Sequence, residues 1–111
     1  MGQYTKATTT DEIESGGCVA VKIKGVFVGI YNIGGEYYAI NNICPHLGGV
    51  LSYGFLTNNV ITCPLHMWEF DVTTGDCIWP GQDRIATYPV KVKGKHILVN
   101  VDSPTYQDTQ D

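Results

Sequence analysis

Two short segments of this chain are closely similar, and each brings a cysteine, a proline and a histidine together. The first is Cys44-Pro45-His46 and the second is Cys63-Pro64-Leu65-His66. Each follows a run of residues typical of a β-strand, and proline disfavours a helical conformation at the residue before it. Each cysteine is therefore predicted to lie where a strand ends and a loop begins. Two similar loops that present similar ligands constrain the fold more than any other feature of the sequence.

Turn signals interrupt the rest of the sequence at short intervals, and runs of β-branched and aromatic residues lie between them. The 13 glycines and 5 prolines of the chain fit this pattern. Gly34-Gly35 is a strong signal for a two-residue hairpin. The strands predicted in this way lie at 19–24, 26–33, 36–43, 55–56, 60–62, 87–93 and 95–101.

Only one segment, Thr9–Glu14, resembles the start of a helix, of about one turn. Thr9 and Glu12 have the spacing of a capping box, in which two side chains bond to free backbone N–H groups. Gly16-Gly17 would end such a helix almost at once. The chain is therefore predicted to be all-β, a small antiparallel sandwich or barrel.

The length of 111 residues allows one domain. We expect this domain to span residues 1–102, followed by a polar, disordered tail at 103–111. The longest apolar stretch, Val26–Ile30, is far too short to cross a bilayer, and the polar start of the chain has no signal-peptide core. The chain is therefore expected to be soluble and cytoplasmic, with no membrane partner.

The charge of the chain argues against one class of partner. It has 7 basic and 11 acidic residues and no cluster of lysine or arginine, so the electrostatic footprint of a nucleic-acid-binding protein is missing. We expect instead a protein partner with a basic or neutral face.

Cysteines of an intracellular chain more often ligate a metal or do chemistry than form disulfides. Cys44, His46, Cys63 and His66 could form a [2Fe-2S] centre with two thiolates on one iron and two imidazoles on the other. They could also form a structural zinc site, or be unligated. Packing alone would rarely produce four such residues in two parallel motifs. Zinc modules usually pair cysteine with cysteine, whereas a loop with one cysteine and one histidine can reach both irons of a cluster.

The two motifs resemble the cluster-binding loops of the Rieske [2Fe-2S] family. The matching segments read C-P-H-L-G-G at 44–49 and C-P-L-H-M-W-E-F-D at 63–71. Gly48 and Gly49 allow positive φ angles, which turn backbone N–H groups toward a buried anion such as sulfide. The resemblance spans most of residues 18–101 and also includes Leu51-Ser52-Tyr53-Gly54, Thr74-Gly75, Pro80, Tyr88-Pro89-Val90 and Gly94.

The resemblance implies a Rieske-type antiparallel β sandwich or barrel with a small cluster-binding subdomain at about 43–82, formed by the two loops. It implies one [2Fe-2S] cluster, with Cys44 and Cys63 on the inner iron and His46 and His66 on the outer iron. Reduction of the cluster adds negative charge, which favours protonation of the iron-bound imidazoles. The reduction potential is therefore expected to fall with pH once these imidazoles titrate.

Four positions distinguish this chain from respiratory and photosynthetic Rieske proteins. Those proteins have a second cysteine in each loop, which form a disulfide, and a serine and a tyrosine that donate hydrogen bonds toward the cluster. The corresponding residues here are Gly49, Leu65, Trp68 and Phe70, none of which can do so. Because hydrogen bonds to the cluster sulfurs stabilise the reduced state, the potential is expected near the bottom of the range of roughly −150 to +300 mV.

The whole chain is similar to the stand-alone Rieske ferredoxins of bacterial multicomponent oxygenases. Such a ferredoxin carries electrons from a flavin-dependent reductase to a terminal aromatic-ring oxygenase, either a Rieske non-haem iron oxygenase or a diiron monooxygenase. The resemblance implies an electron carrier of aromatic hydrocarbon catabolism that is not an enzyme, because the chain has no room for a catalytic iron domain. Two alternatives stay open: the small Rieske-like subunit of assimilatory nitrite reductase, and a zinc-stabilised interaction module.

Several apolar residues near the loops are not ligands. We expect Leu65, Trp68 and Trp79 to pack beneath the loops and exclude water from the cluster. The alternative is an apolar docking patch around the two histidines. Pro80–Asp83 resembles the proline-containing third loop that covers Rieske clusters.

Other residues that could carry chemistry have simpler interpretations. Cys18 and Cys77 lie outside the motifs and are expected to pack as buried thiols. His96 is expected to be a surface or strand residue. A turn after Phe70 is predicted to be shaped by Asp71, Thr74 and Gly75.

Overall fold

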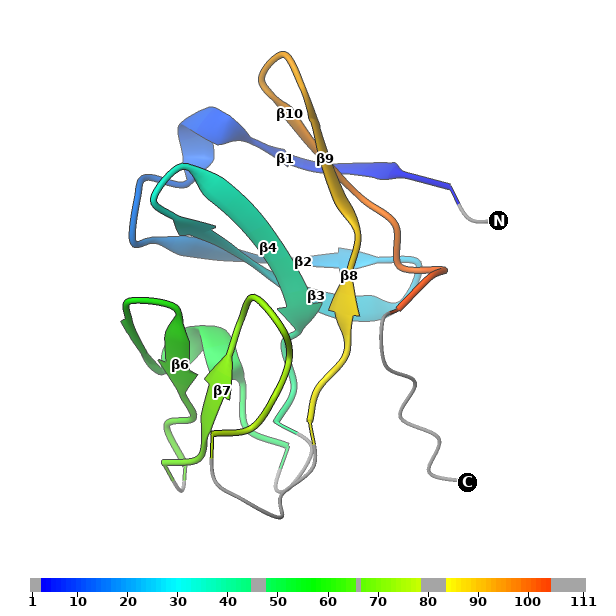
Figure 1. Cartoon of the computed structure of the whole chain (residues 1–111). Helices are drawn as coiled ribbons and strands as arrows, with labels where there is room; N and C mark the ends of the chain where they lie inside the picture. Colours follow the sequence, from blue (N-terminus) through cyan, green and yellow to red (C-terminus); the bar gives the residue numbers. More distant parts are fainter. Residues whose placement is uncertain (1–2, 45–47, 66, 79–83, 105–111) are drawn as a thin grey trace.

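The computed structural model of the protein describes residues 3–44, 48–65, 67–78 and 84–104. Within these ranges ten β-strands form three antiparallel sheets, joined by the 3₁₀ turns η1 (Thr10–Glu12) and η2 (Leu51–Tyr53) (Figure 1). The first sheet has the order β1 (Thr5–Thr9), β10 (His96–Val99), β9 (Val90–Lys93); the second β2 (Cys18–Ile23), β3 (Val26–Ile33), β4 (Glu36–Asn41), β8 (Thr87–Tyr88); and the third β5 (Phe55–Thr57), β6 (Val60–Thr62), β7 (Glu69–Asp71). All neighbouring strands run antiparallel, so the predicted all-β antiparallel fold is confirmed. No helix in these ranges is long and apolar enough to span a membrane.

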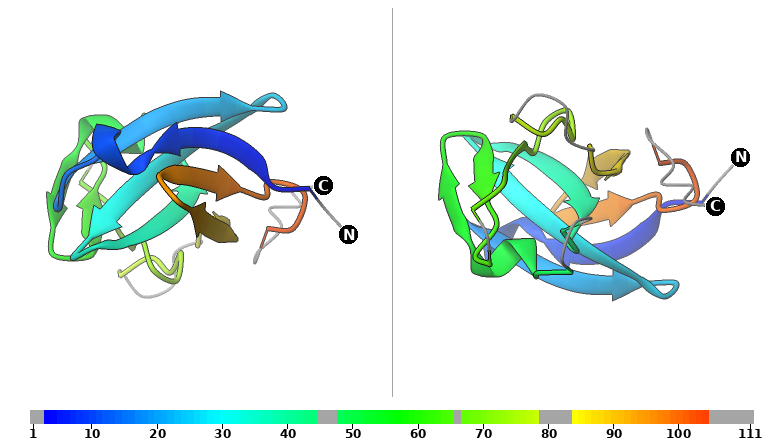
Figure 2. Two further views of the ribbon diagram at one scale, coloured as in Figure 1. Left: turned by 90° about the horizontal axis from the view of Figure 1, so that it is seen from above. Right: turned by 90° about the horizontal axis from the view of Figure 1, so that it is seen from below.

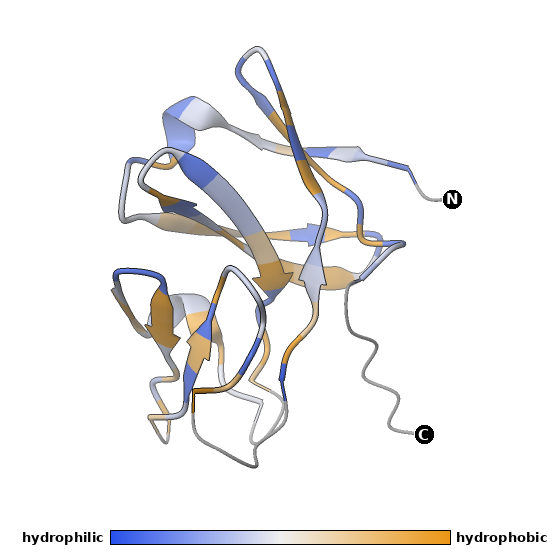
Figure 3. Ribbon diagram, viewed as in Figure 1, coloured by the Kyte–Doolittle hydropathy of each residue, from blue (hydrophilic) through white to orange (hydrophobic). Residues whose placement is uncertain are grey.

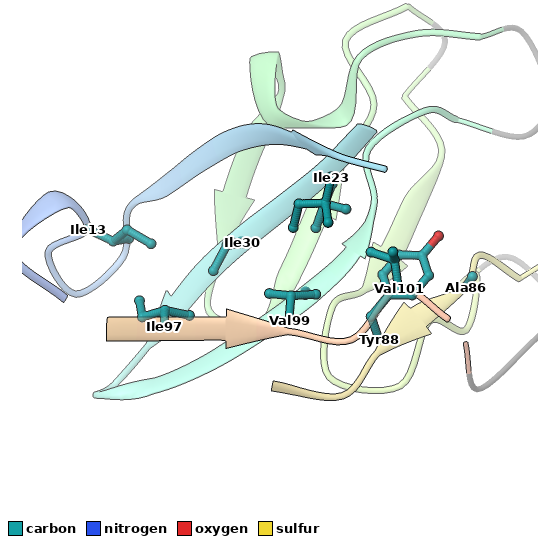
Figure 4. Close-up of a cluster of buried hydrophobic side chains, with 10 residues drawn as sticks. Ile13, Ile23, Ile30, Ala86, Tyr88, Ile97, Val99 and Val101 are labelled. Carbon is teal, nitrogen blue, oxygen red and sulfur yellow. The ribbon is translucent and has the colours of Figure 1, made fainter. Parts of the chain in front are cut away.

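The second sheet lies between the other two and has a hydrophobic core on each face. The barrel core lies between the first and second sheets, where Val99 of β10 points toward Ile23 of β2 (Figure 4). Its buried members are Ile13, Ile23, Val28, Ile30, Ala39, Ala86, Tyr88, Ile97, Val99 and Val101. The loop-side core lies between the second and third sheets, and its buried members are Tyr31, Ile40, Cys44, Leu51, Ile61, Cys63, Phe70, Val72 and Ile85.

Strand β3 contributes to both cores. Val28 and Ile30 belong to the barrel core, whereas Tyr31 belongs to the loop-side core. Because successive side chains of a strand point to opposite faces, a strand covered on both sides is buried without interruption, as β3 is over residues 28–32. In β2, by contrast, Ala20 and Lys22 are exposed. The uninterrupted apolar run of β3 is thus the sequence signature of a strand between two cores.

The third sheet and the loops attached to it lie at one end of the molecule, at the bottom of Figure 1. Both views of Figure 2 place β5 and β6 at the side away from the start of β1. Strand β6 is hydrophobic and the turn at 58–59 before it is hydrophilic (Figure 3), and Ile61 at its centre is 1% exposed. The third sheet is therefore attached to the rest of the protein by burial of its apolar face.

The predicted strands at 26–33 and 60–62 have the bounds of the structure, whereas the other predicted strands differ from it; two of the differences have a clear physical reason. The segment Thr87–Lys93, predicted as one strand, is divided at Pro89, so that β8 pairs with β4 while β9 pairs with β10. Proline has no N–H to donate to a ladder, and the chain passes there from the second sheet to the first. Strand β4 ends at Asn41 instead of residue 43, because Ile43 forms an isolated bridge with Val50.

The predicted helix start at Thr9–Glu14 is confirmed as one short turn, but its predicted capping box is wrong. The segment forms a single 3₁₀ turn, and the Thr9 side chain makes no capping hydrogen bond. Thr9 belongs to β1 and pairs with His96, and the Thr10 N–H donates to the Lys95 carbonyl oxygen at 2.8 Å. The pairing of β1 with a strand at the other end of the chain has therefore replaced the local helical hydrogen bonds.

Candidate metal centre

The first cysteine loop follows β4 and is closed by backbone hydrogen bonds. After the bridge between Ile43 and Val50, the Cys44 N–H donates to the Gly49 carbonyl oxygen at 2.8 Å. The Gly48 N–H donates back to the Cys44 carbonyl oxygen at 3.0 Å. Gly48 has a φ of 77°, in the left-handed region that glycine adopts without a steric penalty. The positive φ predicted for this residue is confirmed.

The second cysteine loop follows β6 and repeats this pattern. The Cys63 N–H donates to the Trp68 carbonyl oxygen at 2.7 Å, and the Met67 N–H donates to the Cys63 carbonyl oxygen at 3.0 Å. Met67 stands at the position that Gly48 occupies in the first loop and has a φ of 66°. The described parts of the two loops therefore have the same hydrogen-bond pattern and the same left-handed position.

The two loops meet at Gly49. A Cβ atom on Gly49 would lie 3.1 Å from Cys63 Sγ and 3.0 Å from Leu65 Cδ1. The φ angle of Gly49 is not in the left-handed region, so of the two glycines that allow a positive φ only Gly48 adopts one. The missing side chain matters because it lets the second loop approach the first.

Both predicted thiol ligands are buried at this meeting point. Cys44 is 1% exposed and Cys63 is 0% exposed, and both belong to the loop-side core. Thiolate is the form of cysteine that binds metals, and burial in apolar surroundings disfavours it unless a cation compensates the charge. Two buried thiols on touching loops therefore fit a group that both loops ligate through sulfur. The other predicted ligands, His46 and His66, lie outside the described residues.

An aromatic pair lines the second loop. Phe70 is 0% exposed, and its ring lies 6.4 Å from that of the half-buried Trp68, centroid to centroid, at 44°. Trp68 packs against the loop-side core, as predicted. Leu65 is 61% exposed, so the prediction that it packs beneath the loops is wrong; it lies over Gly49 and remains open to solvent. Trp79 and the predicted third loop at 80–83 lie outside the described residues.

The turn after β7 is organised by Asp71. Its Oδ1 accepts hydrogen bonds from the Thr73 N–H (2.8 Å), the Thr73 hydroxyl (2.6 Å) and Asn59 Nδ2 (3.0 Å). Partial burial raises the pKa of Asp71, but the hydrogen bonds from Thr73 and Asn59 outweigh it and hold the pKa below its ordinary value. Gly75 has a φ of 85°, and a Cβ there would overlap the Ile85 carbonyl oxygen. The predicted turn is confirmed, and it holds the segment entering β8.

Three other residues that could bind metals lie outside the two cysteine motifs. The Cys18 thiol donates to the Ser52 carbonyl oxygen at 3.8 Å, and burial raises its pKa. Cys77 is half-buried and bridges to Phe70, and none of the described cysteines forms a disulfide. His96 is an exposed residue of β10. The packing and surface roles predicted for them are confirmed.

Asn42 is fully buried beside the first loop, and nothing in the sequence singles it out. Its side chain makes hydrogen bonds only to Ser52 among the described residues. Two consecutive asparagines after a strand are a turn signal. That signal does not identify the partner, because Ser52 lies beyond the loop.

Comparison with known proteins finds a matching family and similar relatives. The Rieske [2Fe-2S] domain family matches residues 3–89 of the chain. The ferredoxin component of the naphthalene 1,2-dioxygenase/salicylate 5-hydroxylase systems of a Ralstonia species is 38% identical over 100 residues, which cover 89% of this chain and 96% of the relative.

Solved structures are similar over most of the chain. The ferredoxin of carbazole 1,9a-dioxygenase from Nocardioides aromaticivorans IC177 has a TM-score of 0.83 at 33% identity, covering 87% of this chain and 96% of that chain. A chain in the complex of reduced oxygenase and oxidized ferredoxin in carbazole 1,9a-dioxygenase has a TM-score of 0.85 at 26% identity, covering 94% and 97%. A nitrite reductase small subunit from Mycobacterium tuberculosis, at 23% identity and a TM-score of 0.81 over 90% and 96%, shares the fold alone.

Proposed function

The chain belongs to the Rieske [2Fe-2S] domain family, and from this membership we propose that it carries single electrons in a multicomponent oxygenase system. It receives them from a flavin-dependent reductase and passes them to a terminal aromatic-ring oxygenase. The relatives that are ferredoxin components of such systems support this role, and the oxygenase–ferredoxin complex supports the acceptor. The proposal includes a cytoplasmic location.

The ligands in this proposal are Cys44 and Cys63 on one iron and His46 and His66 on the other iron of one [2Fe-2S] cluster. The burial of both thiols, on loops with the same hydrogen-bond pattern, supports the assignment. When bound, the cluster supplies a centre that takes up and releases one electron. The two loops hold the thiolates at the edge of the loop-side core, where water is excluded.

The residues around the thiols favour a low reduction potential. Phe70 is fully buried and has no hydroxyl, Gly49 has no side chain, and Leu65 is apolar. None of these three residues can donate a hydroxyl hydrogen bond that would stabilise the extra negative charge of the reduced state. We expect the potential near the bottom of the range of roughly −150 to +300 mV.

The second loop also offers a contact surface for a redox partner. Leu65 and Met67 are 61% and 52% exposed, next to the proposed ligands. Electron-transfer complexes are small and transient, so a few exposed apolar side chains suffice. Contact at this loop would bring the partner close to the cluster.

Metal and sulfide analysis combined with electron paramagnetic resonance of the reduced protein tests the proposal. We expect two irons and two acid-labile sulfides per chain, as in a [2Fe-2S] cluster, with a rhombic Rieske-type signal. One zinc ion without sulfide would contradict the electron-carrier function and support the interaction module.

Cysteine variants test the ligand assignment. Cys44→Ser and Cys63→Ser should abolish the rhombic signal, whereas Cys18→Ser and Cys77→Ser should retain it as matched controls. A full signal in Cys63→Ser would remove Cys63 from the ligand set.

Transfer to a partner can be measured directly. The reduced protein is mixed anaerobically with an oxidised carbazole or naphthalene dioxygenase, and reoxidation is followed by visible absorption. Reoxidation by the oxygenase is expected, and its absence alongside rapid transfer to an assimilatory nitrite reductase would favour the other role.

A further inference from the structure

Asn42 lies at the base of the first loop and is 0% exposed. Its N–H donates to the Phe27 carbonyl oxygen at 2.9 Å, and its carbonyl oxygen accepts from the Leu51 N–H at 2.8 Å. Its side-chain Oδ1 accepts from the Ser52 N–H at 2.9 Å, while Nδ2 donates to Ser52 Oγ at 2.8 Å. One residue therefore connects the start of β3 to both residues at the far end of the loop.

These contacts are the first in a series that ends at a proposed ligand. After Asn42 comes the bridge between Ile43 and Val50, and then the Cys44 N–H that donates to the Gly49 carbonyl oxygen. Each link lies one residue further along both sides of the loop. The position of Cys44 therefore depends on how firmly the base of the loop is held.

The second loop has a different base. Strands β6 and β7 pair from Val60–Asp71 to Thr62–Glu69, directly before Cys63. Within the described residues, the first loop has an isolated bridge at the corresponding place. The hydrogen bonds of the Asn42 amide thus stabilise the base of the first loop, where strand pairing stabilises the base of the second.

The Asn42 amide packs against Gly29, which has no side chain. A Cβ on Gly29 would lie 2.8 Å from Asn42 Oδ1 and 3.2 Å from Asn42 Cγ. On the other side, the Cys18 thiol donates to the Ser52 carbonyl oxygen. Ser52 is therefore held through its N–H, its hydroxyl and its carbonyl oxygen, and the first two of these groups are bonded to the Asn42 side chain.

We propose that Asn42 is a positioning residue that fixes the Cys44 side of the cluster and, through it, the reduction potential. The inference rests on the proposed function. Asn42 itself makes no ligand bond. Removing its amide releases the first loop and leaves the strand-supported second loop in place.

The test compares Asn42→Ala with Asn32→Ala. Asn32 is also buried, at 5% exposure. Its amide donates to the Ile13 carbonyl oxygen (2.9 Å) and the Tyr37 hydroxyl (3.5 Å), and like that of Asn42 it accepts from one backbone N–H, of Gly35 (2.8 Å). Both variants lose a buried amide, so both should lower the melting temperature. Only Asn42→Ala should accelerate amide hydrogen exchange in residues 43–50 several-fold, with 62–69 unchanged.

The cluster provides the second readout. Asn42→Ala should shift the g values and the reduction potential, whereas Asn32→Ala should leave both as in the wild type. Ser52→Ala removes one of the side-chain bonds and should give a smaller shift in the same direction, and Ser52→Thr, which keeps the hydroxyl, should restore the wild-type values. If Asn42→Ala does not fold, the two Ser52 variants provide the test.

Wild-type exchange in 43–50, or unchanged g values and potential in Asn42→Ala and Ser52→Ala, would overturn the inference. A wild-type protein without iron would instead overturn the proposed function. The exchange measurement distinguishes the two failures, because it reports on the loop base without reference to the cluster.

Discussion

The two cysteine loops have the same backbone hydrogen bonds but different side chains and different supports. The first loop has Gly48 and Gly49 where the second has Met67 and Trp68. The first rests on an isolated bridge and the Asn42 amide, whereas the second continues the β6–β7 ladder. The same loop geometry is therefore formed with two glycines in one loop and with two large side chains in the other. The glycines leave space at Gly49, and Leu65 and Cys63 of the second loop occupy it.

The largest effect is expected from filling that space. Gly49→Val should destabilise the fold by about 1–3 kcal/mol, the usual range for overpacking, because its Cβ would press on Leu65 and the Cys63 sulfur. Iron content should fall with it. Urea unfolding and metal analysis measure both effects.

Leu65→Ala provides the control for this variant. Leu65 is mostly exposed, so its truncation alone should change stability little. Combined with Gly49→Val it should recover part of the loss, because one of the two clashing neighbours is gone. Strict additivity of the two changes would show that the loops do not press on each other there.

The next effect concerns the left-handed position that the loops share. Gly48→Ala should cost about 1–2 kcal/mol, because residues with a Cβ are strained at positive φ. Met67→Gly relieves that strain in the second loop but increases the freedom of the unfolded chain. Its net effect should therefore lie within about 1 kcal/mol of zero.

Chemical denaturation of both variants tests this difference. Equal losses in Gly48→Ala and Met67→Gly would indicate that the shared position is not governed by φ. The expected result is a clear loss in the first and a small change in the second.

Acid should weaken the support of the second loop through Asp71. Its pKa is held below the ordinary value in the folded protein, so the unfolded chain binds more protons as the pH falls. The stabilisation is complete above the unfolded pKa of about 3.9 and is lost as the pH drops through the folded pKa. Urea unfolding between neutral and acid pH should show this loss in the wild type. Asp71→Asn should flatten that limb of the curve, and an unchanged slope would contradict the assignment.

The smallest effect is expected at Cys18, which touches the base of the first loop only through a long S–H bond to Ser52. Cys18→Ala should change the free energy of unfolding by less than about 1 kcal/mol, because thiols are weak donors. Since burial raises its pKa, the native thiol should react slowly with iodoacetamide and quickly once unfolded. Rapid alkylation of the native protein would show that the base of the loop opens readily.

Much of the fold can be predicted from local patterns. The hairpin at Gly34-Gly35 and the apolar run of β3 are visible in the sequence because turn chemistry and side-chain alternation act between near neighbours. The division at Pro89 was missed because a proline can also lie within an edge strand. Strand β1 was missed because its sequence is polar and its partner, β10, lies at the far end of the chain.

In the candidate site, too, local patterns could be predicted and contacts between separate segments could not. The Cys-Pro motifs predict Cys44 and Cys63 as candidate ligands, since proline restricts the backbone before it. The amide of Asn42 could not be assigned to Ser52, nor the missing side chain of Gly49 to Leu65, because each contact joins segments separated by a loop. Exposure of Leu65 was equally hidden, since an apolar residue beside a ligand suits either a core or a surface.

The division of the interior by one sheet has a consequence for how the protein matures. The barrel core draws all its buried members from outside residues 40–85, so no proposed ligand takes part in it. The loop-side core contains both thiols. We therefore expect the barrel core to pack without iron and sulfide, and to stay packed when the cluster is lost.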